Sequence, residues 1–122
     1  MGECRRCGRL FLHELDRLAK MRASFAFEST LSGLSYVNRL KKWNAAGYRI
    51  EIVYLRLPSK SLALRRIASR VKQGGHNVPK ADVIRRFDRS RMNFQNVYRL
   101  LADGWTVYDN SHSKPILLER SQ

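Results

Sequence analysis

Residues 50–57 constrain the fold more than any other stretch, because they form the clearest strand in the sequence. Isoleucine, valine, tyrosine and leucine fill most of this segment, and β-branched and aromatic side chains favour the extended backbone of a sheet. Pro58 directly follows this segment and ends the strand, since proline has no backbone N–H to donate. The chain therefore contains a sheet, and the remaining sequence must supply the elements that pack with it.

The rest of the chain alternates between helical and extended patterns. Helices are predicted from the spacing of apolar residues over residues 8–22, 33–47, 59–72 and 79–102. Further short strands are predicted over residues 24–27 and 105–108, and a last edge strand over residues 116–120. Strands that alternate with helices of this length imply parallel strands joined by crossover helices. We therefore expect a layered α/β fold in a single domain of residues 1–122.

The charge balance predicts an anionic partner. Lys and Arg number 24 against 10 acidic residues, which gives a formal charge of +14 and a pI near 10.7. Nucleic acid, a nucleotide, an acidic protein or a membrane surface would each satisfy this surplus, and the charge does not choose among them. No apolar run approaches the length of a membrane span and no apolar signal segment opens the sequence, so we expect a cytoplasmic protein without a membrane partner.

Cys4 and Cys7 form a C-x-x-C pair, which can be half of a zinc site or a redox motif. Zinc needs four ligands, there is no second C-x-x-C, and His13 alone would leave the coordination shell incomplete. Nothing before Cys4 could form the strand that precedes a redox pair. We therefore expect no metal site and interpret both residues as incidental thiols.

Arginines surround a Gly74-Gly75 turn that separates two of the predicted helices. Arg70 precedes the turn, and Pro79 suits the first turn of the helix that follows it. The arginines after the turn are Arg85, Arg86, Arg89 and Arg91. Guanidinium groups bind phosphate oxygens through two parallel hydrogen bonds. Several of them around a flexible glycine turn are therefore suited to a segment that closes over the phosphates of a ligand.

A charged, solvated helix surface is the alternative interpretation of the same arginines. Asp82 and Arg86 are spaced for an i,i+4 ion pair, and Arg85 and Asp88 are spaced for an i,i+3 pair. Arg70, near a helix end, also interacts favourably with the helix dipole. Composition alone leaves the two interpretations about equal.

Three short segments follow predicted strands, and two of them are polar. They are Glu28-Ser29-Thr30, Leu57-Pro58 and Asp109-Asn110-Ser111. Ligands of parallel α/β sheets bind beyond the carboxyl ends of the strands, so we expect one candidate site along this edge. Glu28 is either a solvated strand end or a carboxylate that holds a substrate hydroxyl. The other candidates also have purely structural interpretations. Thr30 could stabilise its turn, Asn110 could cap the turn after its strand, and His76 could be a polar loop residue.

Together these pieces resemble the zeta-toxin family of P-loop kinases, especially its bacterial members described as predicted ATPases. The matching pieces occur in the family's order and cover nearly the whole chain: 25–33 (FAFESTLSG), 47–48 (GY), 70–79 (RVKQGGHNVP), 85–87 (RRF) and 108–111 (YDNS). The combination is specific, although each piece alone is not.

The resemblance implies a three-layer, P-loop kinase-like parallel sheet that transfers the γ-phosphoryl group of ATP, with Mg²⁺, to a small-molecule hydroxyl. In the best-known members the acceptor is a UDP-activated amino sugar, a precursor of the bacterial wall. Matched by position, Glu28 and Thr30 would bind the acceptor substrate, and Arg70 and Arg86 would be catalytic. The residues that would contact the nucleotide are Arg70, His76, Arg86 and Asn110. His76 stands where some members have a second arginine.

One departure from the family is large. The family begins with a strand and a G-x-x-x-x-G-K-[ST] loop, followed by a strand with the acid proposed as catalytic base, and none of the 122 residues forms that loop. We therefore expect an N-terminally truncated domain with an incomplete sheet and little or no ATP-dependent kinase activity. Two alternatives stay open: a non-catalytic basic module that binds nucleic acid, and a fragment completed by a partner chain such as an antitoxin.

Overall fold

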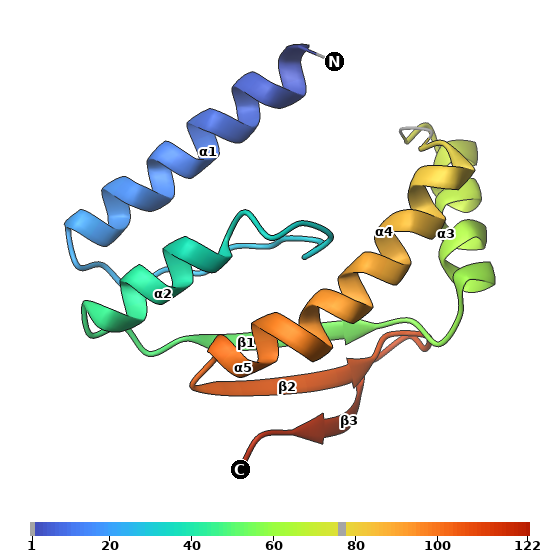
Figure 1. Ribbon diagram of the computed structural model, residues 1–122. Coiled ribbons are helices and arrows are strands. Elements are labelled where there is room, and N and C mark those ends of the chain that lie inside the picture. The colour runs from blue at the N-terminus through green and yellow to red at the C-terminus, as the bar shows by residue number, and fades with distance from the viewer. Residues whose placement is uncertain (1, 76–77) are drawn as a thin grey trace.

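A three-stranded sheet forms the centre of the molecule in the computed structural model, which describes residues 2–75 and 78–122, with side chains from Gly8 onward (Figure 1). The strands are β1 (Glu51–Arg56), β2 (Gly104–Asp109) and β3 (Ile116–Arg120). β1 and β2 run parallel, as predicted, and β3 pairs antiparallel with β2 at the edge of the sheet. The sheet order is therefore β1-β2-β3, a mixed sheet with its parallel pair at one side.

Five α-helices and one π-helical turn accompany the sheet in the described part of the chain. They are α1 (Gly2–Lys20), α2 (Val37–Ala45), α3 (Lys60–Lys72), α4 (Lys80–Asn93), the π turn η1 (Phe94–Tyr98) and α5 (Arg99–Leu101). Ser59 caps α3 by accepting a hydrogen bond from the Leu62 N–H at 3.2 Å. The long helix predicted over residues 79–102 is thus interrupted by η1. α3 and α4 form a hairpin that extends beyond the sheet (Figure 1).

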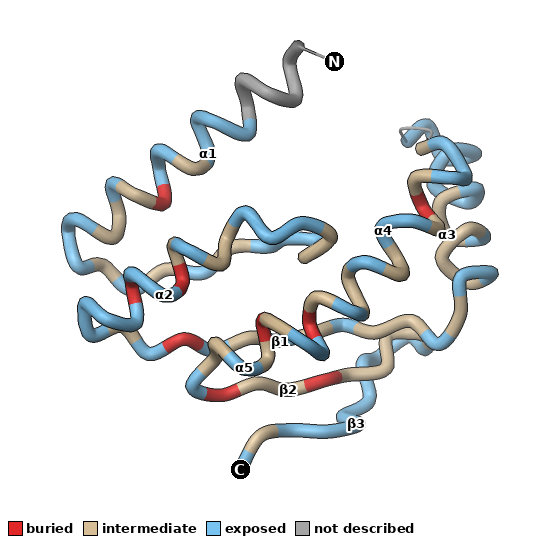
Figure 2. Tube along the Cα trace, viewed as in Figure 1, coloured by how far each residue is buried: buried red, intermediate tan, exposed pale blue. Residues whose placement is uncertain are grey.

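The core lies between the sheet and the helical segments that cross one of its faces (Figure 2). Tyr54 of β1 stacks on Phe94 of η1, with ring centroids 4.4 Å apart, and Trp105 of β2 meets Phe94 edge-on at 6.0 Å. The buried core residues are Leu15, Leu40, Trp43, Ile50, Phe94, Tyr98 and Val107. On the opposite face, Val53 and Leu55 of β1 are 63% and 50% exposed, so that face is uncovered in the described part of the chain.

Residues 24–27 do not form the predicted strand. Residues 23–28 alternate between half-buried and exposed side chains, as a strand with one packed face does. Phe25 and Phe27 contact Trp43 of α2 at ring-centroid distances of 5.3 and 6.3 Å. Within the described residues, however, the backbone of this segment belongs to no sheet. Alternation specifies the buried face, but a strand also needs a hydrogen-bonded neighbour, and here aromatic contacts hold an extended segment without one.

Candidate functional site

Glu28 and Thr30 share one exposed loop, residues 28–33, which follows the extended segment. The Thr30 Oγ1 and Ser32 Oγ atoms lie 2.8 Å apart and form a hydrogen bond within the loop. The loop therefore presents a carboxylate and hydroxyl groups that are close together in the sequence and accessible to solvent. Glu28 and Thr30 are the two residues predicted to bind the acceptor.

Hydrogen bonds from the end of α4 and from η1 hold the backbone of this loop. Leu31 has a φ of +56°, a left-handed conformation that is uncommon for a residue with a bulky side chain, and its N–H donates to Ser29 Oγ at 3.1 Å. Asn93 Nδ2 donates to the Leu31 carbonyl at 2.8 Å, and the Tyr98 hydroxyl donates to the Gly33 carbonyl at 2.7 Å. Burial raises the pKa of Tyr98 above its ordinary value of 10.0, so the hydroxyl is a donor at neutral pH.

The turn between α3 and α4 requires both of its glycines. Gly74 has a φ of +91°, which favours glycine. Gly75 donates its N–H to the Arg70 carbonyl at 2.7 Å, and a Cβ at this position would lie 2.9 Å from the same oxygen, closer than side chains approach backbone. The turn thus packs against the end of α3 beside Arg70. His76, the other residue predicted to contact nucleotide here, lies outside the described residues.

The two acids of the α3–α4 hairpin pair with other bases than those predicted. Asp82 pairs with Arg85 at 2.7 Å, and Asp88 pairs with Lys60 of α3 at 2.9 Å. The pairs that helical spacing allows, Arg86 with Asp82 and Arg85 with Asp88, therefore do not form. The packing of α3 against α4 brings Lys60 to Asp88, and helical spacing within α4 alone cannot predict this contact between two helices. Asp82 pairs with Arg85 at i,i+3 in place of Arg86 at i,i+4.

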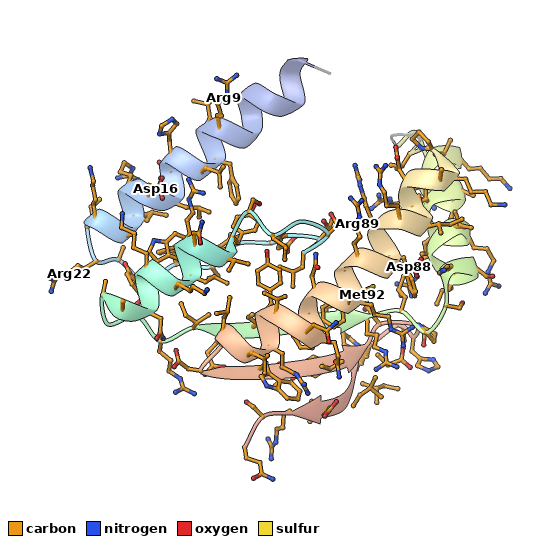
Figure 3. All side chains as sticks on the ribbon, viewed as in Figure 1. Arg9, Asp16, Arg22, Asp88, Arg89 and Met92 are labelled. Carbon is orange, nitrogen blue, oxygen red and sulfur yellow. The ribbon has the colours of Figure 1, made fainter. Side chains whose placement is uncertain are left out.

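Arg70 and Arg86 are exposed and have no carboxylate partner among the residues that the structure describes. Residues 60–93 contain ten basic and two acidic residues, and both acids are already paired. In Figure 3, Arg89 extends from α4 toward the side on which the 28–33 loop lies, while Asp88 extends toward α3. The hairpin therefore keeps a large positive surplus, which suits anionic oxygen atoms.

The residues after β1 and β2 meet at the carboxyl edge of the parallel pair. Asn110 donates its N–H to the Arg56 carbonyl at 2.8 Å, as the parallel-strand rule leads us to expect. Hydrogen bonds from the side chain and backbone of Ser111 lower the pKa of Asp109 below its ordinary value of 3.8. A small open cavity of about 190 Å³ beside them is lined by Arg56, Pro58, Asp109 and Leu118.

The predicted site residues occupy separate places rather than a common cavity. Glu28 and Thr30 lie in one loop, Arg70 and Arg86 lie on the hairpin, and Asn110 lies at the edge of the sheet. A larger cavity of about 370 Å³, where η1 crosses the sheet, is lined by residues that include Tyr54, Arg56, Arg91, Phe94, Asn96 and Glu119. None of the predicted site residues that the structure describes lines it. The sequence also did not identify Asn93 and Tyr98, whose role depends on contacts between distant segments.

The described part of the chain contains no group of three or more His, Cys, Asp or Glu side chains that could hold a metal ion. The side chains of Cys4 and Cys7 lie outside the described residues, so their interpretation stays a prediction. None of the described helices has the length and apolar character needed to cross a membrane.

Comparison with known proteins identifies the family. The Zeta toxin family matches residues 5–122, and the mixed α/β architecture agrees with a partial P-loop kinase-like fold. An uncharacterized protein of Haemophilus influenzae is 39% identical over 57 residues, which are 47% of this chain, and the chain spans 41% of that curated relative. No solved structure matches the chain. Because the family match covers nearly the whole sequence, the chain belongs to the Zeta toxin family.

Proposed function

We propose that this chain carries the acceptor-binding and phosphate-binding parts of an ATP-dependent phosphotransferase that acts on a small-molecule hydroxyl. The observation that supports the proposal is the unpaired positive charge of the α3–α4 hairpin in a chain of this family. Arg70 and Arg86 bind the nucleotide phosphates and act as catalytic residues. Glu28 and Thr30 bind the acceptor, and Asn110 contacts the nucleotide.

Phosphoryl transfer depends on positioning and on neutralising charge. Negative charge on the transferred group is stabilised by cationic side chains, which is the role of Arg70 and Arg86. The Glu28 carboxylate accepts a hydrogen bond from an acceptor hydroxyl, and the Thr30 hydroxyl both donates and accepts. A UDP-activated amino sugar is the proposed acceptor, because it offers hydroxyl groups for these contacts and a diphosphate that suits the basic surface.

Activity of these residues alone is expected to be low. None of the 122 residues forms the G-x-x-x-x-G-K-[ST] loop, whose backbone N–H groups bind phosphates and whose hydroxyl binds Mg²⁺. We propose that turnover at a rate typical of kinases requires such a loop from other residues, supplied in the same protein or by a partner chain.

Calorimetry with ATP and Mg²⁺ tests the role of the hairpin. Charge-assisted hydrogen bonds are each worth about 1.5–3 kcal/mol, so Arg70→Ala and Arg86→Ala should each weaken binding by about tenfold or more. Arg120→Ala is the control, because it removes the same charge from β3 and should change the affinity less than about twofold. Absence of ATP binding, or equal weakening by all three substitutions, would contradict the proposal.

Binding of nucleic acid is the second candidate function, and the same positive surplus favours it. Aromatic residues such as Tyr54, Phe94 and Trp105 pack against one another in the core, where bases cannot stack on them. A single-stranded oligonucleotide of mixed sequence, titrated at several salt concentrations, separates the two functions. Tight, sequence-independent binding that collapses with added salt, together with no ATP binding, would favour the nucleic-acid module.

A further inference from the structure

A π-helical turn brings two hydrogen-bond donors, one at the end of α4 and one in η1, to the same side of the helical axis. In η1 the Arg99 N–H bonds the Phe94 carbonyl, five residues earlier. Residues five apart in an α-helix point about 140° away from each other around the axis. A π turn hydrogen-bonds residues i and i+5, and its wider winding brings these two residues closer to the same side of the axis. Asn93 and Tyr98 are five apart, and both donate to carbonyls of the 28–33 loop.

The loop that receives these bonds needs external support. Its backbone belongs to no sheet in the described part of the chain, and Leu31 lies in the left-handed region. Residues in sparsely populated conformations persist only where their surroundings hold them, and such residues concentrate at functional sites. Asn93 bonds the carbonyl of Leu31 itself, and the buried Tyr98 bonds that of Gly33 two residues later.

We propose that Asn93 and Tyr98 are positioning residues, which hold the loop in the conformation in which Glu28 and Thr30 bind the acceptor. This inference rests on the proposed function for the chemistry of the ligand. Asn93 is the last residue of α4, the helix that also carries Arg86, and Tyr98 is the last residue of η1, which follows it directly. The helix that presents a phosphate-binding arginine thus also supports the acceptor loop, so acceptor and phosphate groups share one framework.

Asn93→Asp tests this role with little change in side-chain size. It removes the amide donor and sets a carboxylate oxygen against the Leu31 carbonyl. Asn96→Asp is the matched control, because Asn96 is an exposed amide in η1 and makes no side-chain hydrogen bond within the described residues. Tyr98→Phe is a second variant, which removes only the hydroxyl and leaves the ring in the core.

Two measurements are made on each full-length variant: hydrogen exchange of the 28–33 backbone, and calorimetric affinity for UDP-N-acetylglucosamine and separately for ATP with Mg²⁺. We expect Asn93→Asp and Tyr98→Phe to accelerate exchange in the loop and to weaken sugar binding about tenfold, the effect of losing one hydrogen bond of this kind. ATP affinity should stay within about twofold, and Asn96→Asp should match the unsubstituted chain in every measurement.

The outcomes separate this inference from the proposed function. If the unsubstituted chain binds the sugar, and neither variant changes sugar affinity or loop exchange, the positioning role is overturned and the proposed function stands. Equal loss of sugar and ATP binding would indicate a general structural role and would also overturn it. If the unsubstituted chain binds ATP but no sugar, the acceptor assignment fails, and the role of Asn93 and Tyr98 in acceptor binding fails with it.

Discussion

Residues 23–28 and strand β1 have the same pattern of exposure but different structures. In both segments, half-buried side chains alternate with exposed ones. β1 pairs with β2 through all six of its residues, from Glu51 opposite Gly104 to Arg56 opposite Asp109. Residues 23–28 have no sheet partner in the described part of the chain. Side-chain patterning therefore decides which face of an extended segment is buried, whereas a neighbouring strand decides whether the segment joins a sheet.

Side-chain contacts hold residues 23–28 in place of backbone hydrogen bonds to a neighbouring strand. Phe25 and Phe27 pack edge-on against Trp43, and Phe25 also contacts Tyr48 at 5.8 Å. The Tyr48 hydroxyl donates to the Ala23 carbonyl at 2.8 Å and so holds the start of the segment. The position of the candidate acceptor loop thus depends on α2 and its following turn, while β1 depends on the sheet.

Removing Trp43 should produce the largest effect on this comparison. Trp43 is buried and contacts both phenylalanines, so Trp43→Ala should lower the free energy of unfolding by about 3–5 kcal/mol, the usual cost of truncating a buried aromatic residue. Val53→Ala, on the exposed face of β1, should cost less than about 1 kcal/mol. Urea denaturation of the two variants checks this difference. Similar losses would mean that the exposed face of β1 is covered in solution.

The sequence predicts part of this architecture because part of it is local. Residues 50–57 and 105–108 are dense in β-forming side chains, and both form strands close to the predicted bounds. The prediction of a strand over residues 24–27 was wrong, because local sequence does not determine whether a neighbouring strand is present to pair with it. The pairing of Asp88 with Lys60 likewise depends on how α3 packs against α4.

The candidate site was predictable to a smaller extent than the fold. The carboxyl ends of β1 and β2 meet as the parallel-strand rule predicts, and the backbone of the Gly74-Gly75 turn requires both of its glycines. Tyr98 could not be identified, because the π turn shifts the buried face away from the 3.6-residue period from which the helix over residues 79–102 was predicted. Whether Glu28, Arg70 and Arg86 bind ligands stays a prediction.

Hydrogen exchange sharpens the comparison at the level of single segments. β2 is bonded on both sides, by β1 and by β3, so its amides should exchange only through large openings of the structure. The amides of residues 24–28, which lack a ladder, should exchange faster by at least about tenfold. Mass spectrometry of peptides that cover each segment separates them. Equal protection would show that residues 24–28 acquire a hydrogen-bonded neighbour in solution.

The smallest expected effect concerns the attachment of α1, whose Phe11 packs against Phe27 at 6.0 Å. Arg39 of α2 donates to both carboxylate oxygens of Asp16, at 3.1 and 3.3 Å, and this hydrogen bonding lowers the pKa of Asp16 below its ordinary value of 3.8. Because the pKa is lower in the folded chain, the stabilisation is present above pH 3.8 and is lost as the pH falls through the folded-state value. The pair is partly exposed, so it contributes less than about 1 kcal/mol.

Unfolding measured between pH 7 and pH 2 should therefore show a small stability advantage of the unsubstituted chain over Asp16→Asn that disappears at the acid end. Glu14→Gln is the matched control, because Glu14 pairs with Arg17 inside α1 and does not join α1 to α2. Its loss should leave the exchange of residues 23–28 unchanged, whereas Asp16→Asn should accelerate that exchange. If Asp16→Asn changes neither the pH profile nor the exchange, the ion pair does not hold α1 over Phe27, and the aromatic contacts with α2 alone keep the unpaired segment in place.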